Sequence, residues 1–153
     1  QDSRDRMAGY RYAMEEAGLG AQATVVEATG STVQAGEAAF SAFLGASRPT
    51  AVFACNDPLA IGVVRAARAA GWRVPDDLSV VGFDGTLLAE VCDPPLATVV
   101  QPIEEMGKTA VALLHERLTC ETTTPRKVVV QPLLREAASA SVPSDVHRTE
   151  EGV

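Results

Sequence analysis

The sequence is poor in the residues on which many enzymes and metal sites depend. It has two histidines, His115 and His147, and neither has a neighbouring nucleophile or a spacing typical of metal ligands. GxSxG, HExxH, GxGxxG and P-loop motifs are all absent. We therefore expect no catalytic residue, no metal ion and no cofactor.

Cysteines and long apolar runs are also scarce. Cys55, Cys92 and Cys120 are an odd number without CxxC spacing, which predicts reduced, buried thiols in a cytoplasmic protein rather than a disulfide framework. No run approaches the ~18 apolar residues of a membrane span, and the first residues lack the basic and apolar parts of a signal peptide. The lack of an apolar span predicts no membrane contact, and the reduced thiols favour a cytoplasmic location. The missing signal peptide is discounted, because the chain is expected to be truncated at its start.

Positive charge is in deficit. The chain has 13 Lys and Arg residues against 20 Asp and Glu residues, for a net charge of −7. A protein that binds the DNA backbone needs a basic face, because neutralising phosphates supplies most of the affinity. Arg4, Arg6 and Arg11 are interrupted by acidic residues. We therefore expect no nucleic-acid surface on this chain, whose 153 residues suffice for one domain.

The middle of the chain carries the strongest pattern, which reads as strand, turn, helix, turn and strand. Ala51–Cys55 is an apolar run without alternation, typical of a parallel strand buried on both faces. Asp57 is a candidate N-cap for the next helix, and Pro58 suits a first turn, where no N–H is needed. Gly71 suits the end of that helix. Leu78–Phe83 then predicts a second buried strand.

Polar residues follow both of these strands. Asn56 and Asp57 come after the first strand, and Asp84 comes after the second. Two parallel strands joined by a crossover helix end at the same edge of a sheet, where open α/β sheets bind ligands. The sequence therefore predicts that these three residues lie together at a ligand site.

The flanking segments extend the alternation of helices and strands. We expect helices over 4–18, 33–44 and 102–118, a helical turn over 87–91, strands over 23–26, 96–100 and 127–134, and a disordered tail from 137. This order predicts an α/β fold, a doubly wound parallel sheet with flanking helices.

Several motifs, in order and with similar spacing, resemble the effector-binding core of the LacI/GalR family of bacterial transcription regulators. They are Arg6–Tyr10, Arg48–Phe53, Asn56-Asp57, Val74–Asp77, Ser79–Asp84, Pro95–Pro102 and Met106-Gly107. The resemblance runs from about Ser3 to Arg135. It implies a periplasmic-binding-protein-like fold with a Rossmann-like subdomain.

The resemblance also implies a domain organisation. Residues 1–102 correspond to the core of the C-terminal effector-binding subdomain, and the chain is expected to be truncated at its N-terminus. Residues 103–120 correspond to a crossover helix that packs on an N-terminal subdomain absent from this chain. Residues 127–136 correspond to a returning strand, and residues 137–153 to a disordered tail.

The resemblance implies six ligand-binding candidates. They are Arg6, Ser31, Asn56, Asp57, Asp84 and Gln101. A surface arginine, a loop cap and a hinge hydrogen bond remain the alternatives for Arg6, Asp84 and Gln101. Asp57 is also explained as a helix N-cap, which leaves a ligand contact open for both Asn56 and Asp57. Ser31 stands where the family often has an aromatic residue that stacks on the effector, so a pyranose held between aromatic faces is not expected here.

The resemblance implies that the chain is the effector-sensing region of a regulator. The partners would be a sugar or similar small metabolite, operator DNA contacted only through a headpiece absent from this chain, and a second copy of the protein. The helix from Pro58 and residues 85–95 match regions that pair subunits in the family. The alternatives are a periplasmic sugar-binding protein of a transport system and, more remotely, a small α/β hydrolase that uses Asp84.

Overall fold

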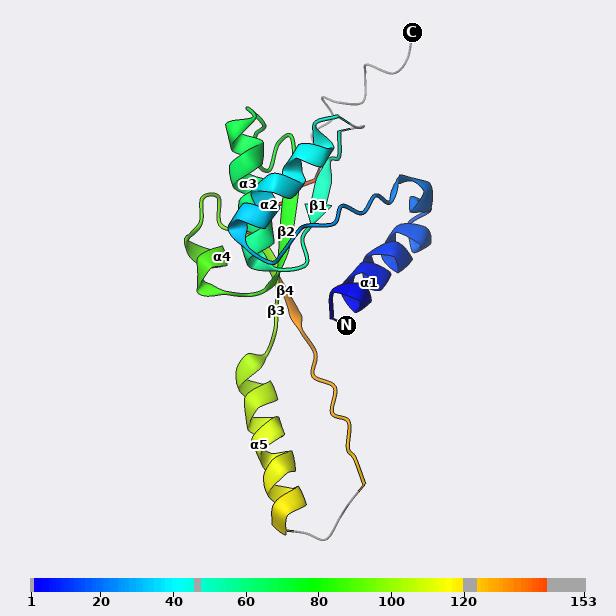
Figure 1. The fold of residues 1–153 in the computed structure, drawn as a ribbon, viewed down its shortest axis with the longest axis vertical. Coiled ribbons are helices and arrows are strands. Elements are labelled where there is room, and N and C mark those ends of the chain that lie inside the picture. The colour runs from blue at the N-terminus through cyan, green and yellow to red at the C-terminus, as the bar shows by residue number, and fades with distance from the viewer. Residues whose placement is uncertain (1, 46–47, 120–123, 143–153) are drawn as a thin grey trace.

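The computed structural model describes residues 2–45, 48–119 and 124–142. Its helices are α1 Asp2–Glu16, α2 Val33–Phe40, α3 Asp57–Ala69, α4 Leu87–Val91 and α5 Ile103–Thr119, with short 3-10 turns at Gly20–Gln22 and Ser41–Phe43. Its strands are β1 Ala51–Phe53, β2 Ser79–Asp84, β3 Ala97–Val100 and β4 Leu133–Arg135 (Figure 1).

The four strands form one sheet in the order β1-β2-β3-β4. The first three strands are parallel, with Val52 opposite Val80 and Gly82 opposite Thr98. This arrangement confirms the predicted α/β fold with a parallel sheet and flanking helices. The fourth strand, β4, pairs with β3 in the antiparallel direction, which the sequence did not predict.

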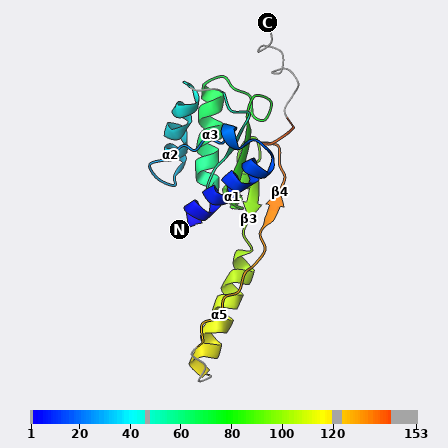
Figure 2. The ribbon, with the colours of Figure 1, turned by 90° about the vertical axis from the view of Figure 1, so that its right-hand side faces the viewer.

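The core lies between α3 and the sheet, with α2 packed over α3 on the same side (Figures 1 and 2). Leu78, Val80 and Leu96 are fully buried. Phe40 of α2 meets Trp72 edge to face, with ring centroids 5.2 Å apart. This packing fixes the start of α3 relative to the ends of the strands, where the predicted site lies.

Two glycines allow α2 and α3 to approach each other closely. A Cβ atom at Gly36 would lie 2.2 Å from the carbonyl oxygen of Leu59, and one at Gly62 would lie 2.1 Å from that of Val33. Both obstacles are backbone atoms, which cannot rotate away as a side chain can. The close contact therefore requires glycine at both positions.

The start of α3 differs from the prediction. Asn56 is the N-cap, and its Oδ1 accepts a hydrogen bond of 2.8 Å from the backbone N–H of Leu59. The prediction that Asp57 caps the helix is wrong, because the helix begins one residue earlier than expected. Asp57 is already the first helical residue, and its side chain is fully buried.

Two predicted strands are absent or shorter than expected. Residues 23–26 form no ladder with the strands of the described residues, although their β-branched side chains favour a strand. The last strand is confined to Leu133–Arg135, directly after Pro132, which has no N–H to donate. The first strand, β1, is half-buried rather than buried, because it lies at the edge of the sheet.

The start of the predicted disordered tail is bound to the sheet. Ser139 is fully buried, and its hydroxyl donates to the carbonyl of Val80 (2.6 Å) and accepts from the N–H of Ala97 (2.8 Å). The backbone N–H of Val80 donates to the carbonyl of Ser139. The prediction is therefore wrong for residues 137–142, where a small polar side chain bridges β2 and β3. Residues 143–153 lie outside the described residues.

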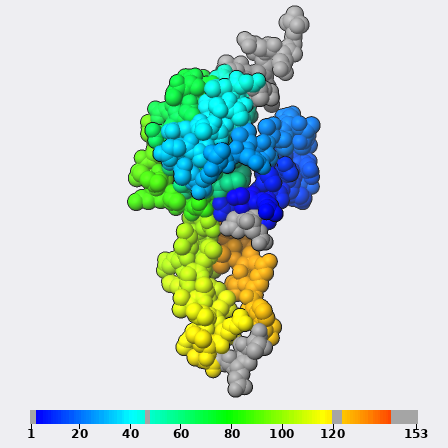
Figure 3. Space-filling view, in the orientation of Figure 1, coloured from blue at the N-terminus to red at the C-terminus, as the bar shows by residue number. Residues whose placement is uncertain are grey.

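The helix α5 and residues 124–132 extend away from the body that contains the sheet (Figures 1 to 3). No residue of α5 is buried. The exposed large apolar side chains of α5 are Ile103, Met106, Val111, Leu114 and Leu118, with exposed fractions of 42 to 77%. None of the helices in the described ranges has both the length and the apolar character needed to span a membrane.

A charged pair closes the turn between α3 and β2. Arg73 donates from Nε and from one terminal nitrogen to the two carboxylate oxygens of Asp77, both at 3.0 Å, and its backbone N–H donates to the same carboxylate at 2.8 Å. These hydrogen bonds hold the pKa of Asp77 well below its ordinary value. Asp77 therefore favours the folded state most when it is ionised.

We expect Gly62→Ala to destabilise the fold by about 3 kcal/mol, because the new methyl group forces α2 and α3 apart. The matched control is Gly9→Ala in α1, where a Cβ meets nothing within 4 Å. That control is expected to raise stability by up to ~1 kcal/mol, from the gain in helix propensity. Urea unfolding measures both. Equal stability of the two variants would contradict the close packing of α2 on α3.

Asp77→Asn is expected to cost about 1 kcal/mol at neutral pH, a value reduced for the exposure of Arg73. Because the folded-state pKa is lowered, the contribution is present above the ordinary pKa of about 3.9 and is lost as the pH falls. The difference from the wild type in urea unfolding should therefore shrink between pH 5 and pH 3. A stability difference that is constant over this range would refute the ionic contribution. The control is Asp76→Asn, which removes the longer ion pair of Arg73 (3.5 Å) at a more exposed carboxylate, and its effect on stability should be smaller.

Candidate functional site

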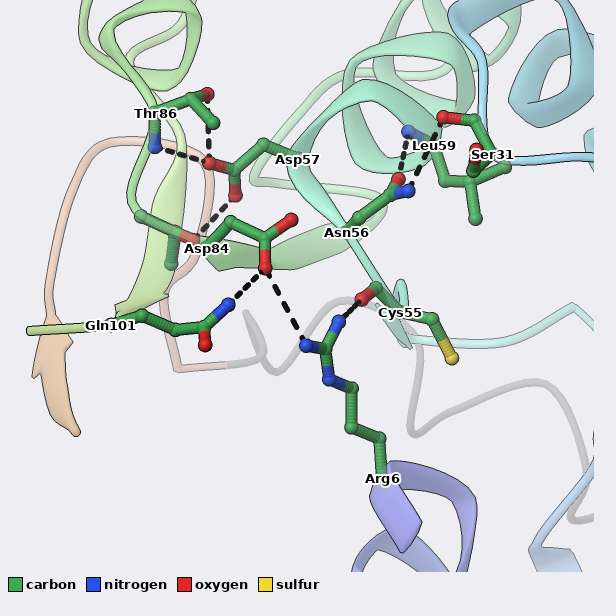
Figure 4. A network of polar contacts seen from close by, with 10 residues as sticks. Arg6, Ser31, Cys55, Asn56, Asp57, Leu59, Asp84, Thr86 and Gln101 are labelled. Carbon is green, nitrogen blue, oxygen red and sulfur yellow. Dashed lines mark hydrogen bonds and ion pairs between the residues drawn. The ribbon is translucent and has the colours of Figure 1, made fainter. Parts of the chain in front are cut away.

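The ends of β1 and β2 lie side by side, as predicted from their parallel pairing (Figure 4). Thr86 lies two residues after β2, and Asp57 is the first residue of α3, which follows β1. The backbone N–H of Thr86 donates to the carboxylate of Asp57 at 2.6 Å. Arg6 and Gln101 reach the same edge from α1 and from the end of β3. Four separate segments thus contribute polar side chains to one cluster.

Asp84 lies at the centre of this cluster. Its Oδ1 accepts a hydrogen bond of 2.5 Å from Nε2 of Gln101 and lies 3.5 Å from a guanidinium nitrogen of Arg6. Its Oδ2 has no hydrogen-bond partner in the part of the chain that the structure describes (Figure 4). With its side chain 26% exposed, Asp84 keeps one acceptor available at the surface.

The backbone of Asp84 is strained. Its φ is 114°, in a region that side-chain-bearing residues rarely adopt, and Gly85 follows at 75°. Such conformations cost of order 1–3 kcal/mol and concentrate at functional sites. The turn after β2 therefore stores strain at the residue whose carboxylate is central to the cluster.

Arg6 is held in place by three contacts. One guanidinium nitrogen donates to the carbonyl of Cys55, another pairs with Asp84, and the guanidinium lies 3.8 Å from the centre of the Phe83 ring. The side chain is only 18% exposed. A planar guanidinium fixed in this way is suited to hydrogen bonds of defined direction.

Asn56 and Ser31 lie next to this cluster. The Nδ2 of Asn56 donates to the backbone carbonyl of Ser31 at 3.2 Å, while its Oδ1 caps α3. Ser31 itself is exposed. Both residues thus border the cluster, with one end of the Asn56 amide committed to the helix.

Asp57 faces the interior of the domain. Its Oδ2 accepts from the N–H and the hydroxyl of Thr86 (2.6 and 2.9 Å), and its Oδ1 accepts from the hydroxyl of Thr98 (2.5 Å). With 0% exposure, neither oxygen reaches the surface. This placement argues against the prediction that Asp57 contacts a ligand.

Sequence reasoning missed Phe83, Thr86 and Thr98. The sequence pattern predicts Phe83 only as part of a buried strand, although alternation places it on the face that Arg6 covers. Thr98 is a polar residue inside a buried strand and therefore needs a hydrogen-bond partner, a signal that was available. Thr86 follows Asp84-Gly85 closely, but nothing in its local pattern indicated a partner 29 positions earlier.

The cluster offers both donors and acceptors. The Oδ2 of Asp84 and the amide oxygen of Gln101 can accept, and the guanidinium of Arg6 can donate. Within the described residues, no group of three or more His, Cys, Asp or Glu side chains is arranged to hold a metal ion. The arrangement is therefore suited to a small ligand with several hydroxyl groups, each of which both donates and accepts.

A hollow of about 370 Å³ lies elsewhere, lined by Arg68, Gly71, Trp72, Arg73, Val74, Asp93 and Pro94. Its charged groups already have protein partners, since Arg68 pairs with Asp93 at 2.7 Å and Arg73 with Asp77 at 3.0 Å. This hollow therefore offers a charged ligand less than the open cluster around Asp84 does.

Comparisons with known proteins agree with the observed fold. The family model of the periplasmic binding protein-like domain matches residues 1–140. The transcriptional regulator DegA of Bacillus subtilis is 47% identical over 104 residues, which are 68% of this chain and 31% of DegA. The regulator CelR of Thermobifida fusca is 40% identical over 128 residues, 83% of this chain and 38% of CelR. The chain thus spans about a third of the length of these curated relatives.

Two solved structures are similar over most of the chain. A LacI family transcriptional regulator from Enterococcus faecium with bound ribose has a TM-score of 0.83 and 27% identity, covering 91% of this chain and 52% of that one. A complex of the regulator CelR with cellobiose has a TM-score of 0.81 and 37% identity, covering 88% and 42%. The chain belongs to the periplasmic-binding-protein-like domain family, in the form found in LacI/GalR-type transcriptional regulators.

Proposed function

We propose that this chain is the effector-binding region of a LacI/GalR-type transcription regulator and that a sugar or similar small metabolite binds at Arg6, Asp84 and Gln101. The observation that carries the proposal is the carboxylate of Asp84, which is fixed through one oxygen and leaves the other available at the surface. Asn56 and Ser31 would line the rim of the same site.

The chemistry of the cluster supports a polyhydroxylated ligand. A carboxylate can accept hydrogen bonds from two neighbouring hydroxyl groups, and a guanidinium can donate to the oxygens of the same ligand. Because Gln101 and Phe83 already hold these groups in place, little side-chain entropy is lost on binding. Solved relatives with bound ribose or cellobiose are consistent with this class of ligand.

The two alternatives receive less support. The curated relatives are transcriptional regulators, which favours a regulator over a sugar-transport protein. For a hydrolase, Asp84 would need a nucleophile or base within reach, but its described polar partners are an arginine and a glutamine. Binding, rather than turnover, is the function that this geometry favours.

In the intact regulator, the effector would bind between two lobes and shift the population toward one arrangement of the DNA-binding headpieces. Operator DNA would be contacted outside this chain, in the cytoplasm. Residues 103–120 would cross to the second lobe, and the exposed apolar side chains of α5 suit such packing.

A second copy of the protein is the proposed partner of α4. Leu87, Leu88 and Val91 are exposed at 72, 55 and 69% on this one short helix. Three large apolar side chains on adjacent turns are costly to leave in water. Their burial against the same helix of a second copy would give a two-fold interface.

Asp84→Asn is the first test of the site. Asparagine tolerates a positive φ, so we expect the variant to fold. In the regulator that contains this chain, we expect one or more of ribose, cellobiose and other sugars or nucleosides to raise the melting temperature. The variant should bind that ligand at least tenfold more weakly, ~1.4 kcal/mol, because it loses the charged acceptor.

The matched pair for this test is Arg6→Lys and Arg11→Lys, both on α1. The first removes the planar donor of the cluster, and the second alters an exposed arginine of the same helix. Calorimetry should show weaker binding for Arg6→Lys and an unchanged affinity for Arg11→Lys. The absence of any ligand, or equal affinity of the two variants, would refute the proposed site.

Leu88→Asp is expected to convert a dimer to a monomer, because a carboxylate in an apolar contact is costly to desolvate. Sedimentation velocity at micromolar concentration measures the mass. Leu44→Asp, at another exposed leucine (56%), is the control and should remain dimeric. A monomeric wild type, or dissociation by both variants, would refute α4 as the interface.

A further inference from the structure

We propose that Asp57 is a positioning residue for the effector site, holding the strained Asp84–Thr86 turn from inside the domain and thereby presetting the carboxylate of Asp84. The inference rests on the proposed function in one respect, that Asp84 binds the effector. The positioning itself concerns the ligand-free protein.

Asp57 anchors Thr86 from inside the domain. The Oδ2 of Asp57 accepts two hydrogen bonds from this one residue, from its N–H at 2.6 Å and from its hydroxyl at 2.9 Å (Figure 4). Hydrogen bonds to a carboxylate are shorter and stronger than those between neutral groups. Thr86 is therefore fixed two residues beyond Asp84.

The carboxylate of Asp57 is itself held in place on its other side. The Oδ1 of Asp57 accepts from the hydroxyl of Thr98 on β3 at 2.5 Å. Room for this oxygen exists because residue 82 is glycine, where a Cβ atom would lie only 2.5 Å from it. Asp57 thus connects the start of α3 with β3 and with the turn after β2, and its side chain is fully buried.

The turn from Asp84 to Thr86 is fixed at both of its ends. Asp84 is paired in the sheet with Val100, and its carbonyl accepts from the N–H of Gln101. Gly85 is pressed against Val100, where a Cβ would lie 2.8 Å from the backbone. Between the fixed Asp84 and the fixed Thr86, the chain turns with a positive φ at both Asp84 (114°) and Gly85 (75°).

The consequence concerns the direction of the Asp84 side chain. At this φ, Oδ1 meets Gln101 and Arg6, and Oδ2 stays available. If the anchor is weakened, the turn can relax toward negative φ, which turns the carboxylate away from both partners. Asp57 would then act on the ligand through Asp84, without touching the ligand.

The test compares Asp57→Asn with the wild-type chain by NMR, without ligand. Asparagine keeps the shape but loses the charge, so the Thr86 amide proton should move upfield as its hydrogen bond weakens. The Asp84 backbone coupling and the Gln101 side-chain amide signals should change with it. Thr86→Val, which loses only the hydroxyl bond, should give a smaller change of the same kind.

Val64→Ala is the control for stability alone, because Val64 is buried in α3 and is not part of the polar network. It is expected to lower the melting temperature while the Asp84, Thr86 and Gln101 signals keep their positions. Unchanged signals in Asp57→Asn, or the same changes in Val64→Ala, would overturn the positioning role.

Titration with D-ribose and with cellobiose, followed by the same signals, gives the second readout. We expect Asp57→Asn to weaken sugar binding about tenfold and Val64→Ala to leave it unchanged below the melting transition. Unchanged sugar binding in Asp57→Asn would overturn the proposal. If the wild type binds neither sugar, the choice of ligand fails, and the ligand-free spectra still decide the role of Asp57.

Discussion

Parallel pairing of β1, β2 and β3 is the constraint on which the polar cluster depends. Because these strands run in the same direction, the residues that follow them are brought to one edge of the sheet. Asn56, Asp84 and Gln101 are far apart in the chain and come to the same edge for this reason, where Gln101 donates to Asp84. Arg6 then reaches the edge from α1 through the Cys55 carbonyl and the Phe83 ring. The fold thus sets the position of each group before any ligand is present.

The cluster combines buried and exposed carboxylates with different roles. Asp57 is fully buried, and the three hydrogen bonds it accepts compensate for its lost hydration. Asp84 remains partly exposed and keeps one free oxygen. A strained turn joins the two carboxylates, so the stability of the core is linked to the geometry of the surface group.

Much of this organisation could be predicted from local sequence patterns. Apolar runs followed by Asn56-Asp57 and Asp84 indicated two parallel strands with polar ends, and the structure agrees. The sequence did not predict that Asn56 caps α3 and that Asp57 is buried. Both residue types can cap a helix, and only the buried partners Thr86 and Thr98 distinguish the two positions. Such partners depend on tertiary contacts.

The wrong predictions for strand pairing and for the tail also arise because tertiary contacts, and not local sequence, decide them. Residues 23–26 have strand propensity but no ladder among the described residues, and Ser139 lies in a segment of disordered composition yet bridges two strands.

The most direct test of the proposed site is a crystal structure of the chain with D-ribose. We expect sugar hydroxyl groups within hydrogen-bond distance of Oδ2 of Asp84 and of the Arg6 guanidinium. A sugar bound elsewhere, such as the hollow at Arg68 and Trp72, with Asp84 untouched, would contradict it.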